Sequence, residues 1–349
     1  MKEYIRKIFA LTACVLLGVT VLLQSGATAQ GIKQGLAVCT NVLIPSLLPF
    51  TVLSAFFVNS RACDFLEKIF LPLTRLFALP EQSAGVLLSS FTGGYPVGCL
   101  SAAELVRQGK ITKLQARRLL IFCVNSGPSF TVGAVGGAML SSTKAGVFLF
   151  ACVTFSALVM GFFSRFFIAD NTEENSTEKI QPPPLSQALV KSVARGGESI
   201  YSICIWAILF SGIGSTLSSV IKSSVINTVL SLILEVTAGC AAAIETGSLP
   251  LTAAVIAFGG ISVHCQVISG GEVTGVKYPE LLVSRLVHAA LSFLTCSLSL
   301  KFLPVSITSC VFAPTVSAQA YSVSAPAAGG LMFLLAVLIS DLDGKRKVW

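Results

Sequence analysis

The sequence predicts an all-α polytopic membrane protein with two inverted repeats, about eight transmembrane helices and two re-entrant helical hairpins. Of its 349 residues, 54% are hydrophobic and only 11% are charged, whereas a soluble domain is about one quarter charged. Long windows contain no Asp, Glu, Lys or Arg, and most can supply the roughly 20 residues that cross a bilayer core. These windows are 8–32, 34–60, 119–143, 145–164, 199–221, 246–271 and 302–340.

The N-terminal segment, residues 1–30, combines a basic start with an apolar run and the small residues Ala27-Thr28-Ala29. A cleavable signal peptide and a retained signal-anchor share these features. We expect a retained first helix, because many spans follow it.

A polar linker divides the remaining chain into two halves of similar order. Residues 170–187 are acidic and carry three consecutive prolines, which is typical of a solvent-exposed, cytoplasmic connection. Each half has an amphipathic start, an apolar segment interrupted by a turn motif, a polar gap and an interrupted helix. We therefore predict repeats over 31–169 and 188–303, followed by a C-terminal helix and basic tail over 304–349.

The basic residues select one topology. Full spans are expected near 8–24, 38–58, 114–140, 145–166, 198–219, 250–269, 281–301 and 325–341, with hairpins over 83–106 and 225–245. Of the 24 basic residues, this arrangement leaves four outside (Lys33, Lys144, Lys222 and Lys301) and the other 20 inside, as the positive-inside rule requires. Both termini are then cytoplasmic, and the hairpins enter from opposite sides. That inversion is typical of secondary transporters.

The first turn motif is "GGYPVG". Gly93 and Gly94 permit backbone conformations closed to other residues, Tyr95 is expected to be extended because a proline follows, and Pro96 suits the start of a helix. We expect one helix to end near Thr92 and another to begin near Pro96. A simple kink in a spanning helix is the alternative, but irregular backbone at membrane depth usually lines a cavity.

The next interrupted helix carries "NSGPSF". Asn125 and Ser126 supply polar side chains, Gly127 supplies flexibility, and Pro128 frees a carbonyl one turn back. We consider all three residues before the proline substrate-binding candidates, while packing of small and polar residues between helices is the alternative.

The second half repeats these features at "LEVTAG" and "GGISVHCQVIS", where we expect the helix to be interrupted within "ISVHCQVIS". Glu235 is an intramembrane carboxylate, which often marks ion coupling or a substrate contact. Thr237 and Gly239 are expected to cap the following half-helix. His264 and Gln266 correspond to the "NSGPSF" region. An interfacial Glu and a structural His are the alternatives.

The predicted half-helix N-termini at both tips favour a small anionic substrate, since these ends carry positive partial charge. Nucleic acid is not an expected partner, because the basic residues flank apolar spans where they meet membrane lipid. No metal or cofactor is expected, since His264 and His288 are isolated and the 11 cysteines form no C-x-x-C pair. No catalytic residues are assigned: a hydrolase using Ser126 and His264 lacks an acidic partner. A non-transporting membrane scaffold remains a second class, and the oligomeric state is open.

With these motifs assembled, the chain resembles the sporulation integral membrane protein family known as YlbJ or SpoVV, within the wider group that carries nucleoside-recognition "Gate" domains. The resemblance covers most of residues 31–300. It rests on "LIPSLLPF", "SSFTGGYPVGCLSAAELVRQGKIT", "LLIFCVNSGPSFTVGAVG", and "LEVTAG" with "FGGISVHCQV".

Such membership implies two gate-like repeats and transport of dipicolinic acid, a small dicarboxylate, towards the developing spore. It also implies a place in the mother-cell-derived outer forespore membrane. A nucleoside or another small solute is the alternative substrate within the transporter class, because a fold does not determine its ligand.

Overall fold

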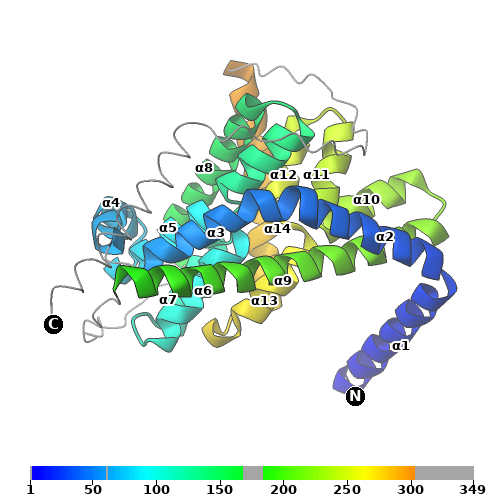
Figure 1. Cartoon of the computed structure of the whole chain (residues 1–349), viewed down its shortest axis with the longest axis horizontal. Helices are drawn as coiled ribbons and strands as arrows, with labels where there is room; N and C mark the ends of the chain where they lie inside the picture. Colours follow the sequence, from blue (N-terminus) through cyan, green and yellow to red (C-terminus); the bar gives the residue numbers. More distant parts are fainter. Residues whose placement is uncertain (1, 60–61, 168–183, 303–349) are drawn as a thin grey trace.

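The computed structural model describes residues 2–59, 62–167 and 184–302, and the regular structure in those ranges is entirely helical (Figure 1). Most of the predicted linker and all of 304–349, with the expected span at 325–341, lie outside the described residues. The helices of the first half are α1 (Lys2–Leu23), α2 (Ser25–Val38), η1 (Cys39–Leu43), α3 (Ile44–Asn59), α4 (Ala62–Leu76), η2 (Glu81–Ser83), α5 (Ala84–Gly93), α6 (Tyr95–Arg107), α7 (Lys113–Cys123), η3 (Ser129–Met139) and α8 (Thr143–Phe167).

The second half begins with a helix of 36 residues, about 54 Å long at 1.5 Å per residue. Its helices are α9 (Leu185–Val220), α10 (Ser224–Leu234), α11 (Val236–Glu245), α12 (Leu249–Phe258), α13 (Gly260–Gly270), η4 (Glu272–Thr274) and α14 (Tyr278–Phe302).

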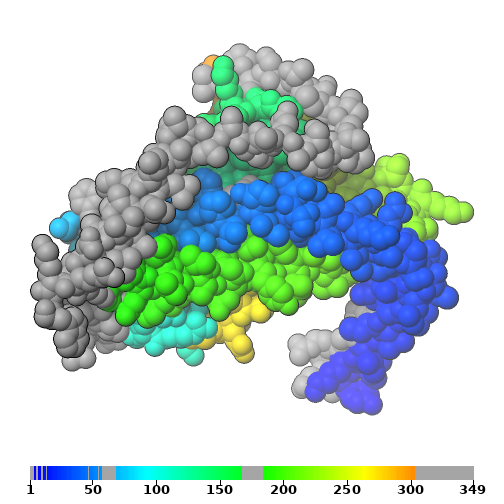
Figure 2. Space-filling model, in the orientation of Figure 1, coloured from blue at the N-terminus to red at the C-terminus, as the bar shows by residue number. Residues whose placement is uncertain are grey.

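The long helix α9 lies alongside the continuous α2–η1–α3 segment, and the two form adjacent green and blue bands across one face (Figure 2). Small residues permit this contact. A Cβ atom added to Gly31 would lie 2.5 Å from the Cβ of Ser215, and one added to Gly196 would lie 2.6 Å from a methyl carbon of Val52. Close backbone approach through small residues is the usual means by which apolar helices associate in membranes.

Helix α1 leaves this body at a sharp angle. The axis turns by 94° between Cys14–Leu23 and Ser25–Leu43, and α1 projects away from the other helices in Figure 1. Its apolar side chains stay exposed, with Leu22 at 77% and Leu23 at 76%. The segment predicted as a signal-anchor is thus a separate apolar helix with few contacts to the body.

Four described helical segments have the length and apolarity to cross a membrane, and a bent pair at the N-terminus raises the number to five. Eight spans were expected. The difference arises partly because the expected span 114–140 is divided into α7 and η3, each of 11 residues. The segments that meet these criteria are Thr143–Phe166, Leu185–Val220, Leu249–Gly270 and Tyr278–Phe302, with the bent pair Cys14–Leu23 and Ser25–Leu43.

Both expected hairpins consist of two short helices that pack against each other, α5 with α6 and α10 with α11. None exceeds 13 residues, or about 20 Å. Each helix is therefore shorter than the roughly 30 Å hydrocarbon core of a bilayer.

Arg118 was counted among the inward-facing charges, but only 2% of the residue is exposed. It donates hydrogen bonds to the carbonyl groups of Phe77 and Ala78, just beyond the end of α4. A buried guanidinium can satisfy several free carbonyls at once because it carries five donors. This arginine therefore stabilises a helix end rather than facing a loop.

Candidate functional site

The first hairpin tip lies directly against the break in the following span. Helix α5 ends at Gly93, and Gly94 (φ 88°) joins it to α6. A Cβ atom added to Gly94 would lie 3.1 Å from the backbone nitrogen of Gly127, and one added to Gly127 would lie 3.0 Å from the nitrogen of Gly94. The two irregular segments thus meet backbone to backbone, and the positive φ angle also favours glycine at Gly94.

The second hairpin tip makes the equivalent contact. Glu235 is extended (φ −141°, ψ 132°) and separates α10 from α11. A Cβ atom added to Gly260 would lie 2.9 Å from the nitrogen of Val236. Each half of the chain therefore brings its hairpin tip against a break in its next helix pair.

Two local expectations in the second half are wrong. Glu235, rather than Thr237 or Gly239, caps α11: its Oε2 accepts a 2.8 Å hydrogen bond from the nitrogen of Ala238. The helix break lies at Gly259 and Gly260, with φ angles of 84° and 75°. The stretch "ISVHCQVIS" is consequently helical, because the two glycines preceding it take the left-handed conformation.

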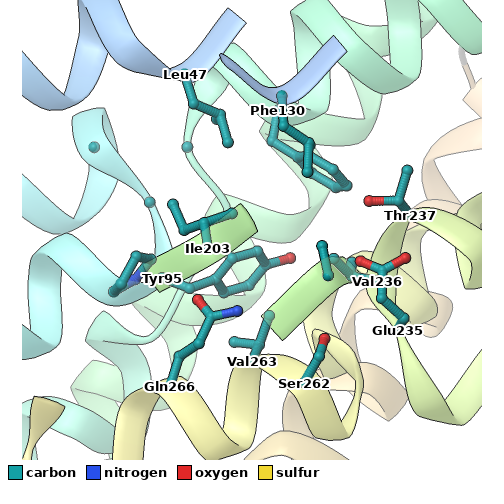
Figure 3. Close-up of a pocket in the computed structure, with 16 residues that line it drawn as sticks. Leu47, Tyr95, Phe130, Ile203, Glu235, Val236, Thr237, Ser262, Val263 and Gln266 are labelled. Atoms are coloured by element: carbon teal, nitrogen blue, oxygen red, sulfur yellow. The ribbon is translucent and has the colours of Figure 1, made fainter. Parts of the chain in front are cut away.

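Both tips, the first break at Gly127 and the helix that follows the second break, α13, border one cavity of about 40 Å³ (Figure 3). Eight of the twelve predicted binding residues line it: Gly93, Gly94, Tyr95, Pro96, Gly127, Glu235, Thr237 and Gln266. The other lining residues had not been selected from the sequence; they are Leu43, Leu47, Phe130, Ile203, Ala207, Val236, Ser262 and Val263.

The cavity combines aromatic and apolar walls with a few polar groups. The ring of Tyr95 extends from the first tip towards the tip that carries Glu235 (Figure 3), and its hydroxyl donates to the carbonyl of Ile256. Phe130 adds a second ring, while Gln266 supplies an amide. An apolar site with a small number of placed polar groups is typical of small-molecule binding.

The volume matches roughly three water molecules, at about 10–15 Å³ each. A ring-bearing metabolite is larger than this, so binding one requires the walls to separate. Those walls come from η1, α3, η3, α9, α13, both hairpins and the first break at Gly127.

Four predicted residues lie behind the cavity lining. Ser126 is buried and shares a 2.6 Å hydrogen bond with Thr131. Nε2 of His264 lies 3.0 Å from the carbonyl oxygen of Phe258. Gly239 packs against α10, because a Cβ atom there would lie 3.0 Å from the carbonyl oxygen of Ser231. The fourth is Asn125.

Several buried polar groups near the cavity lack hydrogen bonds. Asn125 is fully buried, yet both polar atoms of its amide are without a partner. The Thr237 hydroxyl lies near the Glu235 carboxylate but makes no hydrogen bond of acceptable geometry. Nδ1 of His264 is also unpaired. Because more than nine in ten buried polar groups are normally paired, these atoms point to water or a polar ligand.

Sequence reasoning missed Arg285, which is fully buried in α14. Its guanidinium donates to the carbonyls of Ile121 and Val124, at the end of α7, and lies 3.3 Å from Nδ1 of His288. No ion pair joins it to an acidic residue within the described ranges.

The signal for Arg285 was present in the sequence, because it is the one Asp, Glu, Lys or Arg residue between Glu280 and Lys301. We had assigned it to a cytoplasmic boundary. The structure instead places it about 10 Å along α14 from Tyr278, at 1.5 Å per residue.

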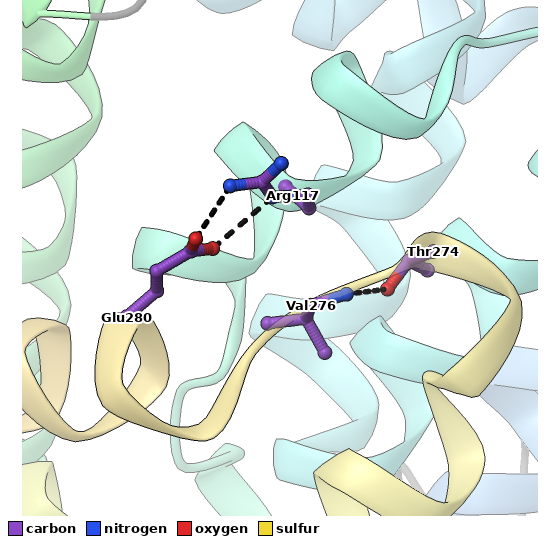
Figure 4. Close-up of polar contacts among 4 residues, drawn as sticks. All are labelled: Arg117, Thr274, Val276 and Glu280. Atoms are coloured by element: carbon purple, nitrogen blue, oxygen red, sulfur yellow. Dashed lines mark hydrogen bonds and ion pairs between the residues drawn. The ribbon is translucent and has the colours of Figure 1, made fainter.

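An ion pair joins the starts of α7 and α14 (Figure 4). Arg117 contacts Glu280 through Nη2 to Oε1 at 2.5 Å and Nε to Oε2 at 3.1 Å. The side chains are 33% and 40% exposed, so the pair contributes little to stability on its own. The bidentate geometry of this pair nevertheless aligns α14, which carries Arg285, with α7, whose last carbonyls Arg285 binds.

The two hairpins present different electrostatic ends to the cavity. No side chain caps the N-terminus of α6, whereas the carboxylate of Glu235 caps that of α11. Helix N-termini carry positive partial charge and attract anions. The N-terminus of α6 is therefore open to an anion, whereas the N-terminus of α11 already binds the carboxylate of Glu235. Within the described residues, no group of three His, Cys, Asp or Glu side chains is arranged to hold a metal ion.

Comparison with known proteins bears on the family. No family model matches the chain, and no solved structure matches it. The chain is 24% identical over 312 residues to the sporulation integral membrane protein YlbJ of Bacillus subtilis (strain 168), with 77% of this chain and 76% of that protein covered. Together with the apolar spans, this similarity supports membrane localisation, and it confirms the chain's resemblance to the YlbJ family of sporulation integral membrane proteins.

Proposed function

We propose that this protein is a secondary transporter of a small anionic metabolite, with dipicolinic acid during bacterial sporulation as the substrate that the resemblance favours. The observation that carries the proposal is the convergence of two hairpin tips on one cavity, with a helix break packed against each tip. Irregular backbone at membrane depth is tolerated where it is buried or lines a cavity, and discontinuous helices commonly form transporter binding sites.

The proposed architecture consists of two inverted repeats. In it α5–α6, α7–η3 and α8 correspond to α10–α11, α12–α13 and α14. The matching contacts of Gly94 with Gly127 and of Val236 with Gly260 support this correspondence. Alternating access would move one repeat-derived bundle against the other around the cavity, with both termini cytoplasmic and the protein in the outer forespore membrane.

The walls of the cavity also support an aromatic substrate. Rings stack favourably in offset or edge-to-face geometry, and both Tyr95 and Phe130 face this space. The uncapped N-terminus of α6 would receive a carboxylate. These features suit a pyridine dicarboxylate.

A nucleoside is the second candidate. The same two rings can stack on a nucleobase, and the amide of Gln266 can pair with its polar edge. Negative charge separates the candidates, because a neutral nucleoside lacks the charge that a free helix N-terminus stabilises in a carboxylate.

The decisive experiment is uptake of labelled dipicolinate and labelled uridine into proteoliposomes. Ala207→Phe places a ring in the cavity, and Ile205→Phe is the matched control, since Ile205 lies two residues away on α9 and is 47% exposed. We expect dipicolinate uptake in the wild type and the control but not in Ala207→Phe. Absence of uptake of both solutes by folded wild-type protein would refute the transporter assignment.

A further inference from the structure

The N-termini of α6 and α11 differ in one respect that affects an anionic ligand. Gly94 leaves the first without a side-chain acceptor, while Glu235 Oε2 holds the nitrogen of Ala238 at the second. Both helices are long enough to carry a dipole, with 13 and 10 residues. Thr237, a residue that is 6% exposed and whose buried hydroxyl lacks a well-formed hydrogen bond, lines the cavity beside this second end.

Glu235 also sets an electrostatic problem for an anionic substrate. The residue is 7% exposed and lines the same small cavity, and no described cation forms an ion pair with it. Two negative groups in a poorly solvated space repel strongly, so one carboxylate of such a pair usually takes up a proton.

The surroundings of Glu235 offer little competing charge. Helices α10, α12 and η3 carry no titratable side chain. The nearby titratable groups are Cys39 on η1, Tyr95 on α6, Cys240 on α11, and His264 and Cys265 on α13. The buried cation Arg285 donates to the carbonyls of Ile121 and Val124 at the end of α7 and forms no ion pair with Glu235.

We propose that Glu235 is a proton-binding site coupled to the anion, so that substrate and one proton cross the membrane together. Protonated Glu235 gives up its hydrogen bond from Ala238, and that backbone N–H then donates to a carboxylate of the substrate. One carboxylate of a dicarboxylate would bind the N-terminus of α6. The other would bind the N-terminus of α11 and the hydroxyl of Thr237.

The exchange conserves protons and hydrogen bonds. A proton from the aqueous side to which the site opens binds the Glu235 carboxylate. On release of the substrate to the other side, Glu235 loses that proton there and again accepts from Ala238. This inference rests on the proposed anion transport but concerns the coupling ion, which the transport assignment leaves open.

Two measurements on the full-length protein test the coupling. The first is proton uptake from weakly buffered solution when dipicolinate binds the purified protein, and we expect about one proton per ligand. The second is transport in proteoliposomes with an imposed pH gradient. A dicarboxylate that moves with one proton carries one net negative charge, so the membrane potential is held at zero with a potassium ionophore. One pH unit is then worth about 1.4 kcal/mol, and a one-to-one symporter accumulates its substrate about tenfold.

Glu235→Gln removes the titration and keeps an oxygen that can cap α11. We expect this variant to exchange labelled for unlabelled dipicolinate across the membrane but to lose the roughly tenfold accumulation driven by one pH unit. Glu245→Gln is the matched control, since Glu245 is an exposed carboxylate at the far end of the same helix, and it should behave as wild type.

The outcomes separate the two proposals. Absence of dipicolinate transport in the wild type contradicts the proposed function. Wild-type transport without proton uptake on binding, or gradient-driven accumulation by Glu235→Gln, overturns the coupling and leaves anion transport standing. Because the first measurement uses the wild type, a variant that fails to fold does not remove the test.

Discussion

Replacement of Arg285 tests whether a buried cation contributes to ligand binding as well as to folding. The guanidinium satisfies the carbonyls of Ile121 and Val124, and leaving a buried acceptor unpaired costs about 1–3 kcal/mol. Arg285→Gln should therefore destabilise the protein by roughly 2–6 kcal/mol, and Arg285→Lys, which can still reach one carbonyl, by roughly half that amount. Part of this loss would appear as a lower melting temperature in detergent.

The matched control is Arg118→Lys. Arg118 is also buried in helical surroundings and also binds two backbone carbonyls, but it lies away from the residues that line the cavity. Because Arg285 holds the carbonyl of Val124, three residues before the cavity-lining Gly127, its loss should weaken binding of a dicarboxylate beyond the effect of lost stability.

The assay is dipicolinate binding to purified protein at a temperature at which each variant remains folded, together with thermal unfolding. We expect Arg285→Lys to lower the affinity at least threefold, or about 0.7 kcal/mol, relative to Arg118→Lys. Equal affinities at equal losses of stability would refute the reasoning and leave Arg285 a purely structural residue.

Two further substitutions test the close contacts of the fold. Gly127→Ala should lower the free energy of unfolding by about 1–3 kcal/mol, because its Cβ atom would lie 3.0 Å from the nitrogen of Gly94. Gly137→Ala is the control: its Cβ atom meets nothing nearer than 3.6 Å, so it should be close to neutral in the same thermal unfolding assay. Gly31→Val should separate α2 from α9 and lower the melting temperature, whereas Gly26→Val, with open space around it, should not. If the two variants of either pair, at 127 and 137 or at 31 and 26, shift the melting temperature equally, the packing described is contradicted.

Local chemistry explains why much of the organisation was predictable. Glycine and proline restrict or release the backbone at their own positions, so the tip at Gly93–Pro96 and the break near Gly127 followed from residue type. Windows without charge identified apolar helices for a related reason, since the cost of burying a charge is large wherever the helix lies in the bilayer.

The same local reasoning failed where several residues compete for one role. Glu235, Thr237 and Gly239 all occur near the start of α11, and only the extended backbone at Glu235 shows which one caps it. Similarly, Gly259 and Gly260 both take left-handed conformations, although the polar residues after them had drawn the expected break to a later position.

The sequence by itself determined the helical membrane class, the positions of both hairpin tips and eight of the residues that line the cavity. Only the tertiary structure decided that the two tips face one space and that Arg285 is buried. Its carbonyl partners lie 161 and 164 residues earlier in the chain. A charged residue near a predicted helix end usually faces water. Only its hydrogen-bond partners, which come from distant parts of the chain, show that Arg285 is a buried cation instead.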